Sequence, residues 1–204
     1  PQASLGLPEY HEWPVFRQTL PDLRGKRVLD LGCGFGWHCR YAVEQGAALV
    51  VGLDLSQRML ARARELQAGF DIDFRNGAIE DIEPVPGSFD VVMSSLVLNY
   101  VQDYRGLCAR ISALLSAGGQ FVFSTQHPVY TAISTQNFVK LNNGTLAWPL
   151  DYYFAEGARA TNFIENNVIM YHRTMETLVM GLIDNGFELQ QLREPAPTED
   201  FMAS

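Results

Sequence analysis

Short apolar runs alternate along the chain with longer segments in which apolar residues recur every three or four positions. The runs have the length and composition of buried parallel strands, and the longer segments have the period of amphipathic helices. The predicted strands cover 28–31, 49–53, 71–74, 89–95, 120–125 and 187–192. The predicted helices cover 9–20, a segment running through Val43, 56–66, 103–117 and 174–185.

This alternation predicts an α/β fold: a doubly wound, Rossmann-like, mostly parallel sheet with helices on both faces and an aromatic-rich insertion after the fifth strand. The connection between the third and fourth strands departs from this alternation of strands and helices. Pro84, Pro86 and Gly87 leave it too short and too broken for a full helix. At 204 residues the chain, 1–204, fits a single domain.

The first predicted strand runs directly into a glycine-rich turn. Gly32, Gly34 and Gly36 follow Val28–Leu31, and glycines at such a turn permit positive φ angles and a ligand's close approach to the backbone. The turn also directs free N–H groups at whatever lies above the strand. By itself this pattern is a weak indication of a ligand site.

Asp54, at the end of the second strand, strengthens the indication of a ligand site. This acid lies 22 residues beyond Gly32, close to the spacing at which an acidic side chain takes the two hydroxyls of a ribose. The third glycine comes one residue too early for a pyrophosphate-binding turn, and Asp30 adds an anion before the first glycine. An anion there suits a ligand with an ammonium group better than one with phosphates.

The Arg27–Trp37 stretch resembles the first motif of class I S-adenosylmethionine-dependent methyltransferases. Phe89–Ser95 is similar to the family's fourth strand, and Leu114–Gly119 to the helix end and turn before its fifth. The segments Ser124–Pro128, Tyr171–Thr174 and Asn185–Phe187 resemble a sub-group of small stand-alone bacterial enzymes. The resemblance implies S-adenosyl-L-methionine as cofactor and methyl transfer to a small-molecule acceptor.

The resemblance also implies which positions contact the cofactor. They are Asp30, Gly32, Cys33, Gly34, Gly36, Asp54, Leu55, Met59, Ala78, Ile79, Glu80 and Ser94. Family members often place an acid after the third strand to accept from the adenine amino group, and here Ala78 stands at that position. The adenine contact must then come from Glu80, from the backbone of Ala78 and Ile79, or from water.

Family members usually end with a seventh, antiparallel strand. Here Glu194–Pro197 breaks the pattern and the sequence stops at Ser204. Either that strand is absent or the sequence is a piece of a longer chain, and we favour the second interpretation.

The net charge and the cysteines restrict the kinds of partner and the cellular location that we expect for this chain. A net charge of −8 repels polyanions, which argues against nucleic acid. No apolar run is long enough for a membrane span and no signal-peptide pattern opens the sequence. Cys33, Cys39 and Cys108 are widely spaced, which favours reduced thiols and a cytoplasmic location. Neither cysteines nor histidines are paired as metal ligands, so no metal is expected, and the protein is expected to be a monomer or homodimer.

Two segments do not follow the alternation of strands and helices. Residues 1–26 form an N-terminal leader, loose over Pro1–Leu7, which either folds over the cofactor or places Trp13 as a cap on the sheet edge. Residues 127–173 hold eight of the chain's 23 aromatic residues. A long excursion of this composition is typical of a functional segment, and we predict a substrate lid; the alternative is an accessory layer or a dimer surface.

His127 and Tyr130 are the predicted catalytic residues, because both follow the fifth strand at the edge where ligands of such sheets bind. His127 is either a general base, a positioning group or a structural residue, since Pro128 restricts it to extended conformations. His172 is a competing candidate, or an anchor of the lid. Asn99 and Tyr100 are expected at the same edge.

Two alternative functions stay open at this point. One is a non-catalytic module that binds S-adenosylmethionine. The other is a nicotinamide-dependent oxidoreductase, which the spacing of the glycines and the Gly118–Gly119 turn disfavour.

Overall fold

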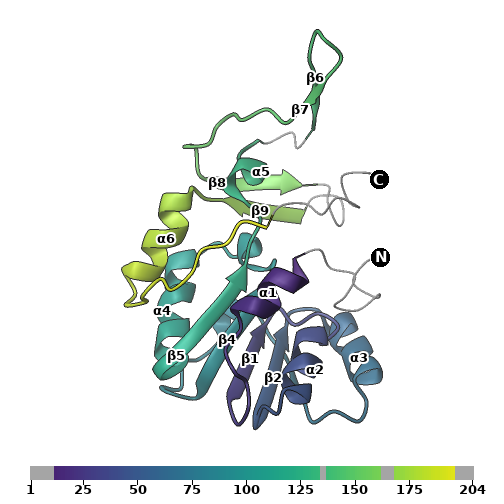
Figure 1. Ribbon diagram of the computed structural model, residues 1–204, viewed down its shortest axis with the longest axis vertical. Coiled ribbons are helices and arrows are strands. Elements are labelled where there is room, and N and C mark those ends of the chain that lie inside the picture. Colours follow the sequence, from purple (N-terminus) through teal and green to yellow (C-terminus); the bar gives the residue numbers. More distant parts are fainter. Residues whose placement is uncertain (1–11, 134–136, 162–167, 196–204) are drawn as a thin grey trace.

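The computed structural model describes residues 12–133, 137–161 and 168–195 (Figure 1). Its main sheet has five parallel strands in the order β3-β2-β1-β4-β5. The strands are β1 (Arg27–Leu31), β2 (Leu49–Asp54), β3 (Asp73–Asn76), β4 (Phe89–Ser95) and β5 (Leu115–Ser124). The strand order reverses between β1 and β4, and ligands of open α/β sheets bind outside the carboxyl ends of the strands at such a reversal.

Helices cover both faces of this sheet, as predicted. They are α1 (Trp13–Thr19), α2 (Trp37–Glu44), α3 (Gln57–Leu66), α4 (Tyr104–Leu114) and α6 (Met175–Ile183). The short helix α5 (Pro128–Ala132) lies instead in the 127–173 segment above the sheet (Figure 1). Successive side chains of β1 point to opposite faces. Val28 joins a core cluster with residues of α1, α2 and α3, whereas Leu29 and Leu31 join a second cluster with residues of α4 and α6.

The helix starts follow local sequence signals. The Ser56 side chain accepts a hydrogen bond from the Met59 N–H, which confirms the predicted N-cap of α3. Asp103 and Thr174 cap α4 and α6 in the same way. These side chains satisfy N–H groups that the first helical turn leaves without an internal partner. Between β3 and β4 the chain forms only the 3₁₀ turn η3 (Ile79–Asp81), as its prolines predict.

Two predicted strands were misplaced along the sequence. The third runs over Asp73–Asn76 rather than 71–74, because Phe74 pairs with Gly52 of β2, where the absent side chain leaves room for the ring. The fifth begins at Leu115, not 120. The predicted turn at 117–119 is an irregularity inside β5, where a Cβ on Gly119 would lie 2.9 Å from the Ser116 carbonyl oxygen.

The predicted sixth strand, 187–192, is wrong. Residues 187–195 lie outside any strand, and the sheet ends at β5. The Phe187 ring contacts the Phe121 ring of β5, while Leu189 and Leu192 are exposed. Although β5 is the edge strand of the sheet and Phe187 packs on it, described residues 187–195 form no ladder with that strand, so this segment does not extend the sheet.

The 127–173 segment rises above the carboxyl ends of the main sheet (Figure 1). After α5 it forms two antiparallel hairpins. Their strands are β6 (Val139–Lys140), β7 (Leu146–Ala147), β8 (Gly157–Thr161) and β9 (Val168–His172). Pro1–Leu7, the start of the predicted 9–20 helix, and Phe163 lie outside the described residues.

Candidate active site

The turn after β1 is built on three glycines in the left-handed region, Gly32, Gly34 and Gly36. A Cβ on Gly32 would lie 2.3 Å from the Val97 side chain, and one on Gly36 would lie 2.6 Å from the Phe74 ring. At these two positions glycine therefore allows Val97 and Phe74 to pack directly against the backbone of the turn. A Cβ on Gly34 would meet no protein atom within 4 Å, so the middle of the turn is an open cradle that a side chain would fill.

Asp54 joins this cradle to the next helix. Its Oδ2 accepts a hydrogen bond from the Gly34 N–H and its Oδ1 accepts one from the Ser56 N–H, both at 2.8 Å. An ionised carboxylate has about four acceptor positions. Two remain for the two hydroxyls of a ribose, and this fits the group predicted there. We call residues 32–36 and 54–56 the glycine edge.

Asp30 lies behind the glycine edge. Its side chain is 1% exposed and accepts a hydrogen bond from the Cys39 thiol, with 3.3 Å between Oδ2 and Sγ. Burial and, to a smaller extent, the nearby charge of Asp54 raise the pKa of this carboxyl to about 7. Cys33 is buried as well, and burial contributes to the raised pKa of its thiol.

The loops beside the glycine edge carry the remaining predicted contacts. Leu55 is 72% exposed and Met59 is half-buried. Ala78 and Glu80 are half-buried, whereas the Ile79 side chain belongs to the core. For Ile79, only the backbone could contact a bound adenine.

Asn76 and Gln67 support the glycine edge and were missed from sequence. The Asn76 amide donates to the Asp54 and Leu55 carbonyl oxygens at 3.0 and 2.9 Å. The Gln67 amide donates to the Phe35 carbonyl oxygen at 3.0 Å. The position of Asn76 at the end of a strand could have indicated its role. No local pattern distinguishes Gln67 from other polar residues of the chain.

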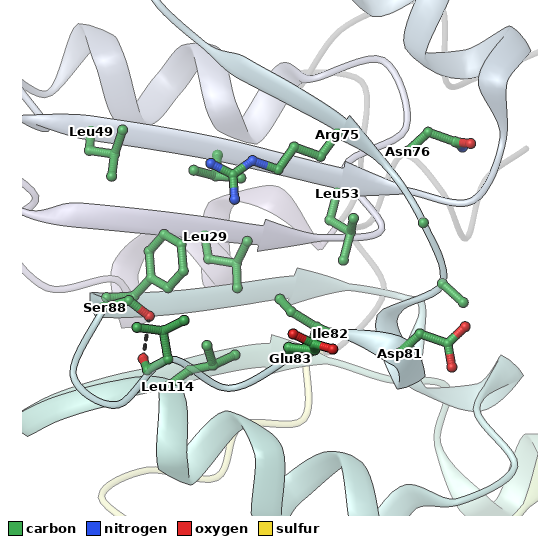
Figure 2. A pocket seen from close by; sticks show the side chains of 15 residues that line it. Leu29, Leu49, Leu53, Arg75, Asn76, Asp81, Ile82, Glu83, Ser88 and Leu114 are labelled. Carbon is green, nitrogen blue, oxygen red and sulfur yellow. Dashed lines mark hydrogen bonds between the residues drawn. The ribbon is translucent and has the colours of Figure 1, made fainter.

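A cavity of about 440 Å³ lies elsewhere, on the sheet face that α4 covers. Figure 2 shows Leu29 and Leu53 of the sheet on one side of it and Ile82 and Glu83 of the β3–β4 connection on another. Gly32, Gly34 and Gly36 are not among the residues that line it, so the cavity is distinct from the cradle.

The other half of the site lies where β4 and β5 end. The Ser94 hydroxyl is buried and donates to the Leu31 carbonyl oxygen at 2.9 Å. The Ser95 hydroxyl donates to the Glu12 carboxylate. Leu96 follows with a φ of 56°, its N–H donating to the Ser124 carbonyl oxygen. A left-handed leucine costs about 1–2 kcal/mol, and such strain concentrates at functional sites.

Several polar side chains gather around these serines. The Asn99 amide, on the 3₁₀ turn η4 (Leu98–Tyr100), donates to Gln126 Oε1 at 2.9 Å, and the Thr125 hydroxyl donates to Asn99 Oδ1. Burial and the neighbouring Tyr130 raise the pKa of Tyr100. Asn99 and Tyr100 thus reach the edge expected for them. We call residues 94–100 and 124–127 the serine edge.

His127 uses both of its ring nitrogens in structural contacts. Nδ1 accepts a hydrogen bond from the Val129 N–H at 3.1 Å, and Nε2 lies 2.7 Å from Glu194 Oε1. Because Nδ1 is an acceptor, Nε2 carries the proton and donates. This arrangement argues against His127 as a base. The Tyr130 ring stacks on Trp148, with 5.0 Å between ring centroids.

Arg173 holds the 127–173 segment to the rest of the domain, whereas His172 joins parts of the segment to one another. Thr131 Oγ1 lies 2.8 Å from His172 Nδ1, and His172 Nε2 lies 2.8 Å from the Tyr153 carbonyl oxygen. Burial lowers the pKa of His172. The Arg173 guanidinium donates to the carbonyl oxygens of Leu98, Val101, Gln102 and Tyr171. His172 therefore braces the segment internally, and Arg173 supplies the anchor to the residues around Leu98–Gln102.

Among residues 12–133, 137–161 and 168–195, no group of three or more histidine, cysteine or acidic side chains could hold a metal ion. No helix in that part of the chain is long and apolar enough to cross a membrane.

Comparisons with known proteins identify the family. Residues 29–123 match the family model described as a methyltransferase domain. A crystal structure of an S-adenosylmethionine-dependent methyltransferase from Mesorhizobium loti is 41% identical, covers 97% of this chain and 90% of its own, and superposes with a TM-score of 0.91. A Haemophilus influenzae protein whose name gives no activity is 36% identical over 94% of this chain and 78% of its own length.

A ubiquinone biosynthesis O-methyltransferase from Neisseria meningitidis is 38% identical over 51% of this chain, and the match spans only 45% of that enzyme. The chain belongs to the class I S-adenosylmethionine-dependent methyltransferases. S-adenosylmethionine is its cofactor, and the nicotinamide-dependent and non-catalytic alternatives are set aside.

Proposed function

We propose that this methyltransferase acts on a small-molecule acceptor bound at the serine edge beneath the 127–173 segment. One observation carries the proposal: polar side chains from α1, β4, η4 and the end of β5 meet at that edge. The 127–173 segment, which Arg173 ties to Leu98 and Val101, would lie over such an acceptor and limit its size. The net charge of −8 also disfavours nucleic acid.

S-adenosylmethionine supplies a methyl group activated by its sulfonium. The chain's residues bind and orient the reactants and exclude water, which is most of what such a transfer requires. We assign the open cradle at Gly34 to the methionine end and the free acceptor positions of Asp54 to the ribose. Asp30 supports the cradle from behind, and Tyr130 with Tyr100 orients the acceptor.

The acceptor's identity does not follow from the relatives. The ubiquinone biosynthesis O-methyltransferase matches about half of this chain and under half of its own, so its substrate is not transferred. The three free cysteines are all buried, which supports the proposed cytoplasmic location.

A screen with methyl-labelled S-adenosylmethionine tests the proposal. The chain is incubated with fractionated metabolite, protein and nucleic-acid extracts, and the label is followed by mass spectrometry. We expect label in one or a few small metabolites. Label confined to protein or nucleic acid would contradict the small-molecule assignment.

A further inference from the structure

Glu12 brings a carboxylate to the serine edge from a distant part of the chain. It directly precedes α1, and its Oε1 accepts a hydrogen bond from the Ser95 hydroxyl, 83 residues away in sequence. The Ser124 side chain is a second hydrogen-bond partner. Ser95 and Ser124 are the last residues of β4 and β5, so the carboxylate lies between the carboxyl ends of two neighbouring strands.

The same residues connect Glu12 to the glycine edge. Ser94, beside Ser95, hydrogen-bonds to the Leu31 carbonyl oxygen at the end of β1. Val97, two residues further, packs so closely on Gly32 that a Cβ there would lie 2.3 Å away. Residues 94–97 therefore lie between Glu12 and the turn that holds the cofactor, so only one loop separates the two.

The charge of Glu12 has no partner in the described chain. No arginine, lysine or histidine of residues 12–133, 137–161 and 168–195 forms an ion pair with it. Its hydrogen-bond partners are the serine hydroxyls, and burial raises the pKa of its carboxyl. By contrast, Asp90 pairs with Arg27 at 2.8 Å. A partly buried anion without a counter-charge is costly, and a cationic ligand would offset that cost.

Glu12 is also held in place by its neighbours. The Trp13 ring lies 4.8 Å from the Tyr41 ring and 5.3 Å from the His38 ring of α2, and Phe16 is buried beside them. These apolar contacts fix α1 without the carboxylate's charge. Replacing Glu12 with glutamine should therefore preserve the fold, because the amide oxygen can still accept from the serines.

We propose that Glu12 is the anionic group of the acceptor subsite and that the acceptor carries an amino group. The inference rests on the proposed function, since it places the acceptor at the serine edge. Glu12 would bind the amino group in its charged form, hold it toward the glycine edge and accept the proton that the nitrogen must lose before it can take a methyl group. Sequence analysis missed this residue because no local pattern connects it with Ser95 or Ser124.

Two cofactor analogues test the proposal without knowledge of the acceptor. Sinefungin carries an amino group where S-adenosylmethionine carries its reactive methyl, whereas S-adenosylhomocysteine carries nothing there. Calorimetry on the whole chain should show sinefungin binding about tenfold or more tighter than S-adenosylhomocysteine. In Glu12→Gln this preference should fall by about tenfold. The matched control Glu65→Gln, on the exposed face of α3, should leave it unchanged.

Each other outcome has a defined meaning. Equal affinities in the parent chain would overturn the proposal without any variant. An unchanged preference in a folded Glu12→Gln would also overturn it, because a structural role, or a contact with the methionine ammonium that both analogues share, moves both affinities together. Binding of neither analogue would instead contradict the cofactor assignments of the proposed function. Methyl transfer to hydroxyl compounds but to none of a panel of small amines would overturn the acceptor class.

Discussion

The glycine edge and the serine edge lie side by side on one sheet but are built by different means. At the glycine edge, consecutive residues act mainly through their backbone: the turn of 32–36 is open at Gly34, and Asp54 receives hydrogen bonds from two N–H groups. At the serine edge the functional groups are side chains, and Glu12, Asn99 and Gln126 come from distant parts of the chain.

The difference follows from what each edge must recognise. A shared cofactor needs the same backbone geometry in every member of a family, and short local patterns encode that geometry. An acceptor differs between enzymes, so side chains that any segment can supply are better suited to bind it. A substitution at one edge should therefore leave the other edge's ligand affinity nearly unchanged.

The largest expected effect concerns Asp30. The unfolded chain loses this proton near the ordinary pKa of 3.8, whereas the folded chain keeps it until about pH 7. The free energy of unfolding should therefore fall as pH rises from about 4 to about 7, by roughly 4 kcal/mol in total. Asp30→Asn should remove that fall, as measured by urea unfolding across pH. Parallel curves for Asp30→Asn and the parent would refute it; the exposed Asp71→Asn serves as control.

Arg173→Met should lower the stability of the protein without weakening cofactor binding at the glycine edge. Four carbonyl oxygens lose a charged donor, so the free energy of unfolding should fall by about 2–4 kcal/mol. Affinity for S-adenosylmethionine should change by less than about twofold, because the anchor does not touch the glycine edge. Exposed Arg110→Met is the control. A large loss of cofactor affinity in the folded variant would show that the edges are coupled.

Asp54→Ala should act only at the glycine edge. Loss of hydrogen bonds to a charged acceptor, about 1.5–3 kcal/mol, should weaken S-adenosylmethionine binding roughly ten- to a hundredfold. Calorimetry measures this affinity directly, with circular dichroism to check the fold. Equal affinities for the folded variant and the parent would remove Asp54 from the ribose site.

The smallest effect is expected for His127→Ala. Both ring nitrogens are already engaged, so turnover on the acceptor found by labelling should fall less than about tenfold and cofactor affinity should be unchanged. A loss of about 10²-fold or more in turnover would restore the general-base role. The melting temperature of the variant reports the contribution of the contact with Glu194.

Sequence alone predicted those features that depend on neighbouring residues. The glycine turn, Asp54, β4 and the Ser56 cap each follow from short patterns. It placed β3 two residues early because the Phe74–Gly52 pairing lies between strands. The predicted sixth strand failed because residues 187–192 do not pair with the edge strand β5, and local sequence does not determine such a pairing. Likewise, the bond between His127 and Glu194 joins residues 67 positions apart, a distance no local pattern spans.

The contacts at the two ends of the 127–173 segment affect how an acceptor can reach its site. Thr131, near the start, lies within hydrogen-bond distance of His172, near the end, so the two ends are joined to each other. Arg173, next to His172, joins this pair to η4 and the residues around it. We therefore expect the base of the segment to stay in place during turnover and the acceptor to enter beside it, so that the space between the segment and the sheet sets which molecules pass.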